Sequence, residues 1–148
     1  MSSHGDYREH HDSHFRIVPA LNAAFLGAVS IECVSKPGHY LRHYSFELHA
    51  HMNDNSPVFA SDASFFIRPS EMGQSSFSFE STNFPNHFVC HNNFVMFVRQ
   101  RQDPMADFTF HLNAVMAGMI GQQFAIQSFN FPDHLVKIEG IIVKYYYY

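Results

Sequence analysis

The sequence predicts an all-β protein built from three similar units of four strands each. Three segments repeat one pattern, and their prolines, Pro37, Pro85 and Pro132, lie 48 and 47 residues apart. The chain has 17 Phe and 7 Tyr, residue types that favour strands, and its helical patterns are poor. A repeat of this period indicates that the architecture itself is repeated.

The three copies are most similar around those prolines. They read SIECVSKPGHYLRH from Ser30, SFESTNFPNHFVCH from Ser78 and AIQSFNFPDHLVKI from Ala125. In the first copy, VSIECVS alternates as a half-buried strand does, and KPG is a turn in which Gly tolerates positive φ. HYLRHY, SFELHAHM and ASFFIRP are then the second, third and fourth strands.

An aspartate opens the fourth strand of each unit. DASFFI from Asp62 matches DFTFHL from Asp107 and also DSHFRI from Asp12. The third copy ends at IIVKYYYY without a fourth strand of its own, so we expect the N-terminal strand to complete it. The sequence therefore predicts a β-trefoil over residues 12–148, with three four-stranded repeats and pseudo-threefold symmetry. Residues 1–11 are expected to be a flexible, His-rich segment.

The alignment also predicts structural roles for equivalent residues. Three core layers are expected: Phe15, Phe65 and Phe110; Phe46, Phe94 and Ile141; and Tyr40, Phe88 and Leu135. Glu32, Glu80 and Gln127 also share one position. An acid that becomes an amide in one copy indicates a repeated hydrogen-bonding role, whereas a catalytic pair needs two acids that converge on one bond.

Composition argues against several classes of partner. The net charge is −4 and the nine Lys and Arg are scattered, which disfavours nucleic acid. No apolar stretch is long enough to span a membrane. The polar N-terminus does not resemble a signal peptide, so a cytoplasmic or non-classically secreted protein is expected, unless the chain is a processed or excised module of a secreted one.

Neither the cysteines nor the histidine-rich N-terminus predicts a functional site. Cys33 and Cys90 lie at non-equivalent repeat positions and are expected to be unbonded thiols. His4, His10, His11 and His14 are close in sequence, but no Cys or fixed strand geometry supports a metal site there. We therefore expect no metal and no cofactor.

The combined motifs resemble the arabinofuranose-binding β-trefoil of fungal α-L-arabinofuranosidases B, the family 42 carbohydrate-binding module. FRIVPALN, VSIECVSKPGHYLRH, SFELHAHMND and DASFFI occur in the family's order, from about Asp12 to the end of the chain. The resemblance implies a shallow sugar pocket in each repeat, lined by a His at the end of the second strand and by the Asp before the fourth. A carboxylate can accept two sugar hydroxyls at once.

Carried over to this chain, the resemblance implies binding by His43 and Asp62 in the first repeat, with Tyr40 nearby. His91 and Asp107 are the counterparts in the second repeat, where the family's Gly, Tyr and Arg are replaced by Asn86, Phe88 and Cys90. In the third repeat Ile138 replaces the His, although Asp12 remains, so that repeat is expected to be scaffold.

Two alternatives remain open at this point. The aspartates could instead hydrogen-bond turn amides, and the histidines could be ordinary polar strand residues. The leading hypothesis is a non-catalytic, lectin-like module that binds arabinofuranose or another glycan. The alternative is a protein-interaction or structural β-trefoil that has lost sugar binding.

Overall fold

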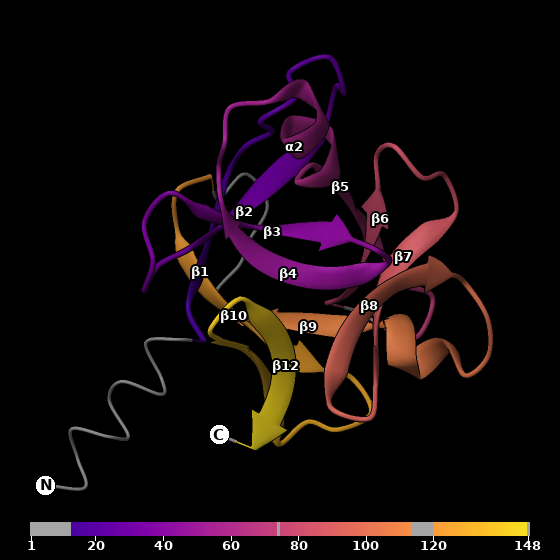
Figure 1. The fold of residues 1–148 in the computed structure, drawn as a ribbon. Coiled ribbons are helices and arrows are strands. Elements are labelled where there is room, and N and C mark those ends of the chain that lie inside the picture. Colours follow the sequence, from indigo (N-terminus) through magenta and orange to yellow (C-terminus); the bar gives the residue numbers. More distant parts are fainter. Residues whose placement is uncertain (1–12, 74, 114–119, 148) are drawn as a thin grey trace, which may run out of the picture.

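The computed structural model describes residues 13–73, 75–113 and 120–147 (Figure 1). These residues contain twelve strands and two short helices. The strands are β1 Phe15–Pro19, β2 Val29–Cys33, β3 His39–Tyr44, β4 Glu47–Met52, β5 Phe65–Pro69, β6 Ser76–Ser81, β7 His87–Asn92, β8 Val95–Gln100, β9 Phe110–Asn113, β10 Gln123–Ser128, β11 His134–Glu139 and β12 Ile142–Tyr147. The helices are α2 Pro57–Asp62 and the 3₁₀ helix η1 Met105–Phe108. The predicted all-β class is confirmed.

Six of the strands form a closed ring of antiparallel pairs. β1 pairs with β2, β2 with β5, β5 with β6, β6 with β9, β9 with β10, and β10 again with β1. The ring therefore places the N-terminal strand beside the last third of the chain, where Phe15 lies opposite Phe124. Closure leaves the ring without a free edge.

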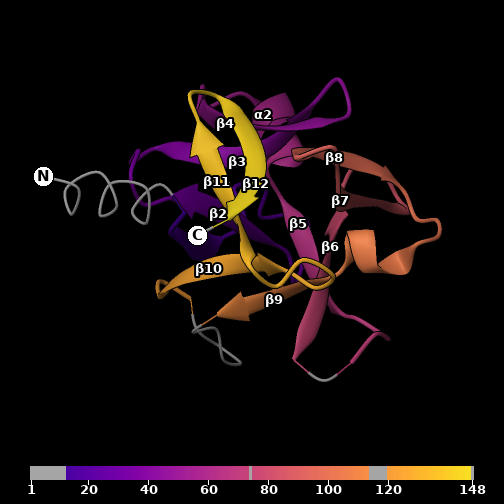
Figure 2. The same ribbon diagram turned by 90° about the horizontal axis from the view of Figure 1, so that it is seen from below.

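The other six strands form the hairpins β3–β4, β7–β8 and β11–β12. The hairpins meet one another through the pairs β4–β8, β4–β12 and β8–β12, and Figure 2 shows β11–β12 lying beside β4. We call β2–β5 the first unit, β6–β9 the second unit, and β10–β12 with β1 the third unit.

The core lies inside the ring and under the hairpins. Phe15, Phe65 and Phe110 are all buried in one apolar cluster, as the sequence predicted. Each hairpin also contributes residues to this cluster, from the face of its two strands that points toward the core. These are Leu41, Val89 and Val136 from the first strand of each hairpin, and Leu48, Met96 and Val143 from the second.

Two of the predicted core layers are wrong. Phe46, Phe94 and Ile141 are 52%, 54% and 51% exposed, because they lie in the tight turns of the three hairpins. Phe46 and Phe94 have φ of 64° and 68°, and the residues before them also have positive φ. Two consecutive positive φ values are typical of a type I′ hairpin turn, which points side chains away from the core.

Tyr40, Phe88 and Leu135 do not form a layer of the main core for a different reason, although Phe88 and Leu135 are buried. These residues alternate with the core residues Leu41, Val89 and Val136, so they occupy the opposite face of each strand. Phe88 packs instead in a small separate cluster with Cys90 and Phe108.

The repeated hydrogen-bonding role of Glu32, Glu80 and Gln127 is confirmed. The carboxylates of Glu32 and Glu80 accept from the backbone N–H groups of Gly38 and Asn86, at 3.0 and 3.1 Å. Gln127 Nε2 donates to the carbonyl of Pro132. Gly38 and Asn86 both have positive φ, as the predicted turn requires.

A short helix, which the sequence analysis did not predict, precedes the fourth strand of the first unit. Ser56 caps the N-terminus of α2: its Oγ accepts from the N–H of Phe59 at 3.1 Å, while Pro57 occupies the first turn. A Ser–Pro pair is a typical helix start. Asp62 is the last residue of this helix and Asp107 lies within η1, so neither opens a strand as predicted; the strands begin at Phe65 and Phe110. None of the described helices is long and apolar enough to cross a membrane.

Candidate functional site

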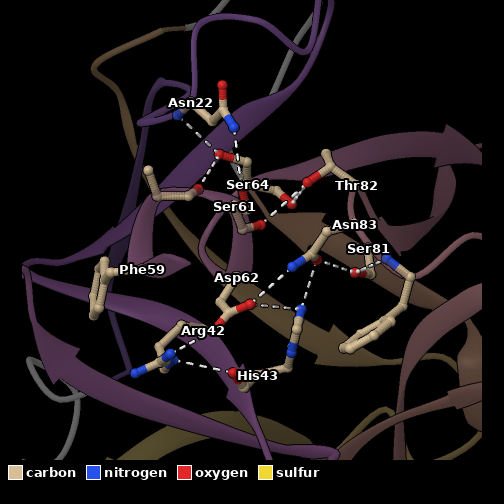
Figure 3. Close-up of polar contacts among 12 residues, drawn as sticks. Asn22, Arg42, His43, Phe59, Ser61, Asp62, Ser64, Ser81, Thr82 and Asn83 are labelled. Carbon is tan, nitrogen blue, oxygen red and sulfur yellow. Dashed lines mark hydrogen bonds and ion pairs between the residues drawn. The ribbon is translucent and has the colours of Figure 1, made fainter. Parts of the chain in front are cut away.

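The candidate site of the first unit is a buried network of an imidazole, an amide and a carboxylate (Figure 3). His43 is the next-to-last residue of β3, Asp62 ends α2, and Asn83 follows β6. His43 Nε2 lies 2.8 Å from Asn83 Oδ1, and Asn83 Nδ2 donates to Asp62 Oδ1 at 2.8 Å. His43 Nε2 is also 3.5 Å from Asp62 Oδ1. Three segments far apart in the sequence thus converge on one carboxylate.

The second oxygen of Asp62 is paired with Arg42. The Arg42 Nη2 donates to Asp62 Oδ2 at 2.5 Å, and both side chains are largely buried. The guanidinium carbon lies 4.9 Å from the ring centre of Phe59 and 5.3 Å from that of Tyr44. Arg42 therefore neutralises Asp62 and fills the space beside it, since a guanidinium both pairs with carboxylates and packs on aromatic faces.

These contacts argue against a turn-capping role for the aspartate and against a solvent-facing position for the histidine. The recorded partners of the Asp62 carboxylate are the side chains of Arg42, His43 and Asn83, and none is a turn amide. His43 is only 3% exposed. The pair therefore belongs to a built polar network and is not a turn cap beside an ordinary strand residue.

Tyr40 lies at the side of this network. Its ring meets the ring of Phe59 edge-on, with centres 6.5 Å apart. Burial, and to a lesser extent the nearby Glu32, raises the pKa of the Tyr40 hydroxyl. Phe59 is thus shared between Tyr40 and Arg42, and Tyr40 is linked to Asp62 through these two residues.

The second unit repeats the same network. His91 Nε2 lies 3.0 Å from Asn130 Oδ1, and Asn130 Nδ2 donates to Asp107 Oδ1 at 2.9 Å. His91 Nε2 is 3.8 Å from Asp107 Oδ1. A serine hydroxyl donates to the amide oxygen in both networks, from Ser81 to Asn83 and from Ser128 to Asn130. Burial is the main reason that the pKa of His91 is lowered.

The two networks differ at one position. Cys90 stands where the first unit has Arg42: Cys90 lies opposite Phe97 in its hairpin, as Arg42 lies opposite His49. A thiol cannot reach the aspartate as a guanidinium does. Consequently Asp107 Oδ2 has no recorded partner among the described residues, and the Asp107 side chain is 30% exposed, against 12% for Asp62.

A hollow of about 120 Å³ opens beside Asp107. Its walls come from the end of β7, from β8 and from the loop that leads into η1. The lining residues are Cys90, His91, Asn92, Arg99, Gln102, Asp103, Pro104, Asp107 and Phe108. The structure thus places His91 and Asp107 in one open, polar pocket.

The third unit lacks most of the network. Ile138 replaces the histidine, as the sequence shows, and Ser35 stands where the other units have Asn83 and Asn130. The hydroxyl of Ser35 is buried without a hydrogen-bond partner. Asp12 lies outside the described residues, and no group of three possible metal ligands occurs among the residues that are described.

Sequence reasoning missed Asn83 and Asn130, the residues that connect each histidine to its aspartate. A signal was present: both follow a serine by two residues and precede a repeated proline, in STNFP and SFNFP. The pattern was not assigned because each asparagine belongs to the unit after the one whose site it completes.

Comparison with known proteins shows the family to which the chain belongs. The model of the α-L-arabinofuranosidase B (AbfB) domain matches residues 1–114. The chain belongs to the AbfB domain family. It is 37% identical over 79 residues to α-L-arabinofuranosidase B of Emericella nidulans, covering 53% of this chain and 16% of that protein. It is 32% identical over 104 residues to an arabinofuranosidase/β-xylosidase of Trichoderma koningii, covering 67% of this chain and 20% of that protein.

Solved structures share the fold of this AbfB domain. A GH54 α-L-arabinofuranosidase soaked with a cyclic sulfate inhibitor superposes with a TM-score of 0.65 at 16% identity, over 90% of this chain and 26% of that one. The designed threefold-symmetric protein ThreeFoil superposes with a TM-score of 0.58 at 8% identity, over 93% and 91% of the two chains. The chain spans a fifth or less of the length of the two curated relatives.

Proposed function

We propose that this AbfB domain is a non-catalytic carbohydrate-binding module on a β-trefoil whose third repeat is completed by β1. The family membership supports sugar binding, because the relatives are arabinofuranosidases. The closed ring and the three hairpins support the trefoil. Against catalysis, the described hydrogen bonds orient one carboxylate in each network, Asp62 in the first and Asp107 in the second, whereas glycosidases generally use two carboxyl groups that flank the bond to be broken.

The observation that carries this proposal is Asp107 Oδ2, which has no hydrogen-bond or ion-pair partner among the described residues. A carboxylate held by one amide and facing a polar hollow is a preorganised acceptor for sugar hydroxyls. His91 and Asn130 fix its orientation without using Oδ2. The hollow in the second unit is therefore the stronger candidate, although its sequence departs further from the family pattern.

The first unit is a second, tighter candidate. His43 and Asp62 have the same arrangement, with Tyr40 at the side, but Arg42 already engages Asp62 Oδ2. A sugar hydroxyl here must share the carboxylate with the guanidinium. We therefore expect weaker binding to this unit than to the hollow at Asp107.

An NMR titration with arabinose and arabinofuranosyl oligosaccharides tests this function. Binding is expected near the millimolar range, about −4 kcal/mol, because one shallow pocket offers few buried contacts. The signals of His91 and its neighbours should shift in the wild type and not in Asp107→Asn. The matched variant Asp62→Asn should leave these shifts unchanged. An absence of shifts at about ten times the expected dissociation constant would contradict arabinose recognition.

One observation favours the alternative function, a protein-interaction module without sugar binding. Exposed aromatic rings gather at the contacts between units: Phe46 lies 5.7 Å from Phe84, ring centre to ring centre, and Phe94 stacks on His134 at 6.2 Å. Exposed aromatic groups are common in protein interfaces. The absence of binding across a broad panel of glycans would favour this alternative.

A further inference from the structure

In the first unit, the positive charge of Arg42 compensates the negative charge of the aspartate in the network. This charge lies against Asp62 Oδ2, in a space bounded by the rings of Phe59 and Tyr44. The position of Arg42 is occupied by Cys90 in the second unit. The second unit thus retains the carboxylate and lacks the cation that neutralises its counterpart.

The other charged residues that line the hollow do not neutralise its negative charge. Asp103 and Asp107 contribute two negative charges, and Arg99 contributes one positive charge. Arg99 packs over the ring of Phe97, at 4.0 Å from its centre, and no described ion pair joins it to either aspartate. The Cys90 thiol is neutral, since burial raises its pKa to about 11. The lining therefore has an excess of one negative charge when His91 is neutral.

The lining also offers polar groups that are suited to a sugar. Asn92 and Gln102, which carry amide side chains, line the hollow together with Asp103 and Asp107. Amides both donate and accept hydrogen bonds, as sugar hydroxyls do. A ligand that combines hydroxyl groups with one positive charge would match this lining better than a neutral sugar.

We propose that the hollow at Asp107 prefers a sugar that carries a protonated amino group over the corresponding neutral sugar. The ammonium group occupies the place that the Arg42 guanidinium takes in the first unit, against Asp107 Oδ2. The hydroxyl groups bind the amides of Asn92 and Gln102. This inference rests on the proposed sugar binding and specifies the class of sugar.

NMR titrations with glucosamine, glucose and N-acetylglucosamine test the preference, at a pH where the amine is protonated. Glucosamine is expected to bind about fivefold to tenfold more tightly than the other two, because a charge-assisted hydrogen bond to a partly exposed carboxylate is only moderately strong. The difference should shrink as salt is added, since salt screens exposed charges. Binding of the two neutral sugars should be insensitive to salt.

Two variants locate the charge that is responsible. Asp107→Asn keeps the size of the side chain and should abolish the preference for glucosamine. Cys90→Arg restores the residue type of the first unit and should abolish it as well, by placing a guanidinium against Asp107. The matched variant Asp62→Asn, in the other unit, should retain the full preference. A native-like NMR spectrum of each variant checks that it folds, and Asp107→Asn alone decides if Cys90→Arg does not fold.

The outcomes separate this inference from the proposed function. If glucose or N-acetylglucosamine binds at the hollow as tightly as glucosamine, the preference is overturned and sugar binding stands. If glucosamine binds more tightly but Asp107→Asn keeps the difference, the assignment to this hollow is overturned. If neither charged nor neutral sugars shift the signals of His91, the inference and the proposed function both fail.

Discussion

Asn83 Nδ2 donates to Asp62 Oδ1 at 2.8 Å, so a residue of the second unit holds the acid of the first. The same asparagine accepts from His43 and from Ser81 through Oδ1. One amide thus orients both the imidazole and the carboxylate of the site. Asn130 does the same for His91 and Asp107, which makes each site a property of two neighbouring units.

Removing this amide should destabilise the protein. Asn83→Ala is expected to lower the free energy of unfolding by about 1–3 kcal/mol, because buried groups of His43 and Asp62 lose a partner. Urea denaturation measures the change. Asn130→Ala is the matched control, and its cost should be about 1 kcal/mol or less, since Asn130 is exposed and water can replace it. Equal losses for both variants would contradict this account.

Removing the largely buried Arg42 should lower the free energy of unfolding more than removing an exposed arginine. Arg42→Ala leaves the largely buried Asp62 without its counter-charge and should lower the free energy of unfolding by about 3 kcal/mol. Arg68→Ala breaks a 2.9 Å ion pair with Glu80, but the Arg68 side chain is 51% exposed. That control should cost about 1 kcal/mol or less. A small effect of Arg42→Ala would show that Asp62 is solvated.

The corrected core assignment predicts opposite results for two phenylalanines. Phe65→Ala should lower the free energy of unfolding by about 3–5 kcal/mol, because Phe65 is fully buried and a cavity remains. Phe46→Ala should change it by about 0.5 kcal/mol, since Phe46 lies in an exposed turn. Thermal or urea unfolding of both variants measures the difference, and a large loss for Phe46→Ala would restore the original alignment of layers.

The two thiols should react slowly in the folded protein. Cys33 and Cys90 are both free and buried, which confirms that they are not bonded to each other. Burial raises the pKa of Cys33 to about 12 and that of Cys90 to about 11, so the thiolate fraction is small near neutral pH. Alkylation should therefore accelerate as the pH rises, first at Cys90 and later at Cys33, and unfolding should remove the difference.

Mass spectrometry after alkylation gives the test, with the urea-unfolded protein as the control. Both thiols should be modified in urea without prior reduction. Modification that requires a reductant, or equal rates in the folded and unfolded protein, would contradict the structure.

The sequence by itself determined the all-β class, most of the strands, and which positions of the repeated segments correspond to one another. Alternation and turn residues are local signals, and a repeat multiplies them, so Phe15, Phe65 and Phe110 were placed correctly in the core. The resemblance to the family also pointed to His43, Asp62, His91 and Asp107, and the structure brings each His within 3.8 Å of its Asp. The layer prediction failed at Phe46, Phe94 and Ile141, where a tight turn, and not a strand, sets the direction of the side chain. It also failed at Tyr40, Phe88 and Leu135, which lie on the strand face opposite the main core.

The tertiary structure decided which of the two networks is open. The motif of the first unit is the more complete, but its Arg42 fills the space beside Asp62, whereas Cys90 leaves a hollow beside Asp107. Sequence spacing carries no information on side-chain volume in three dimensions. The asparagines that orient both acids lie 21 and 23 residues beyond them, and only the closure of the ring brings them together. Hydrogen-bond distances between units depend on how the strands pair, which no local pattern specifies.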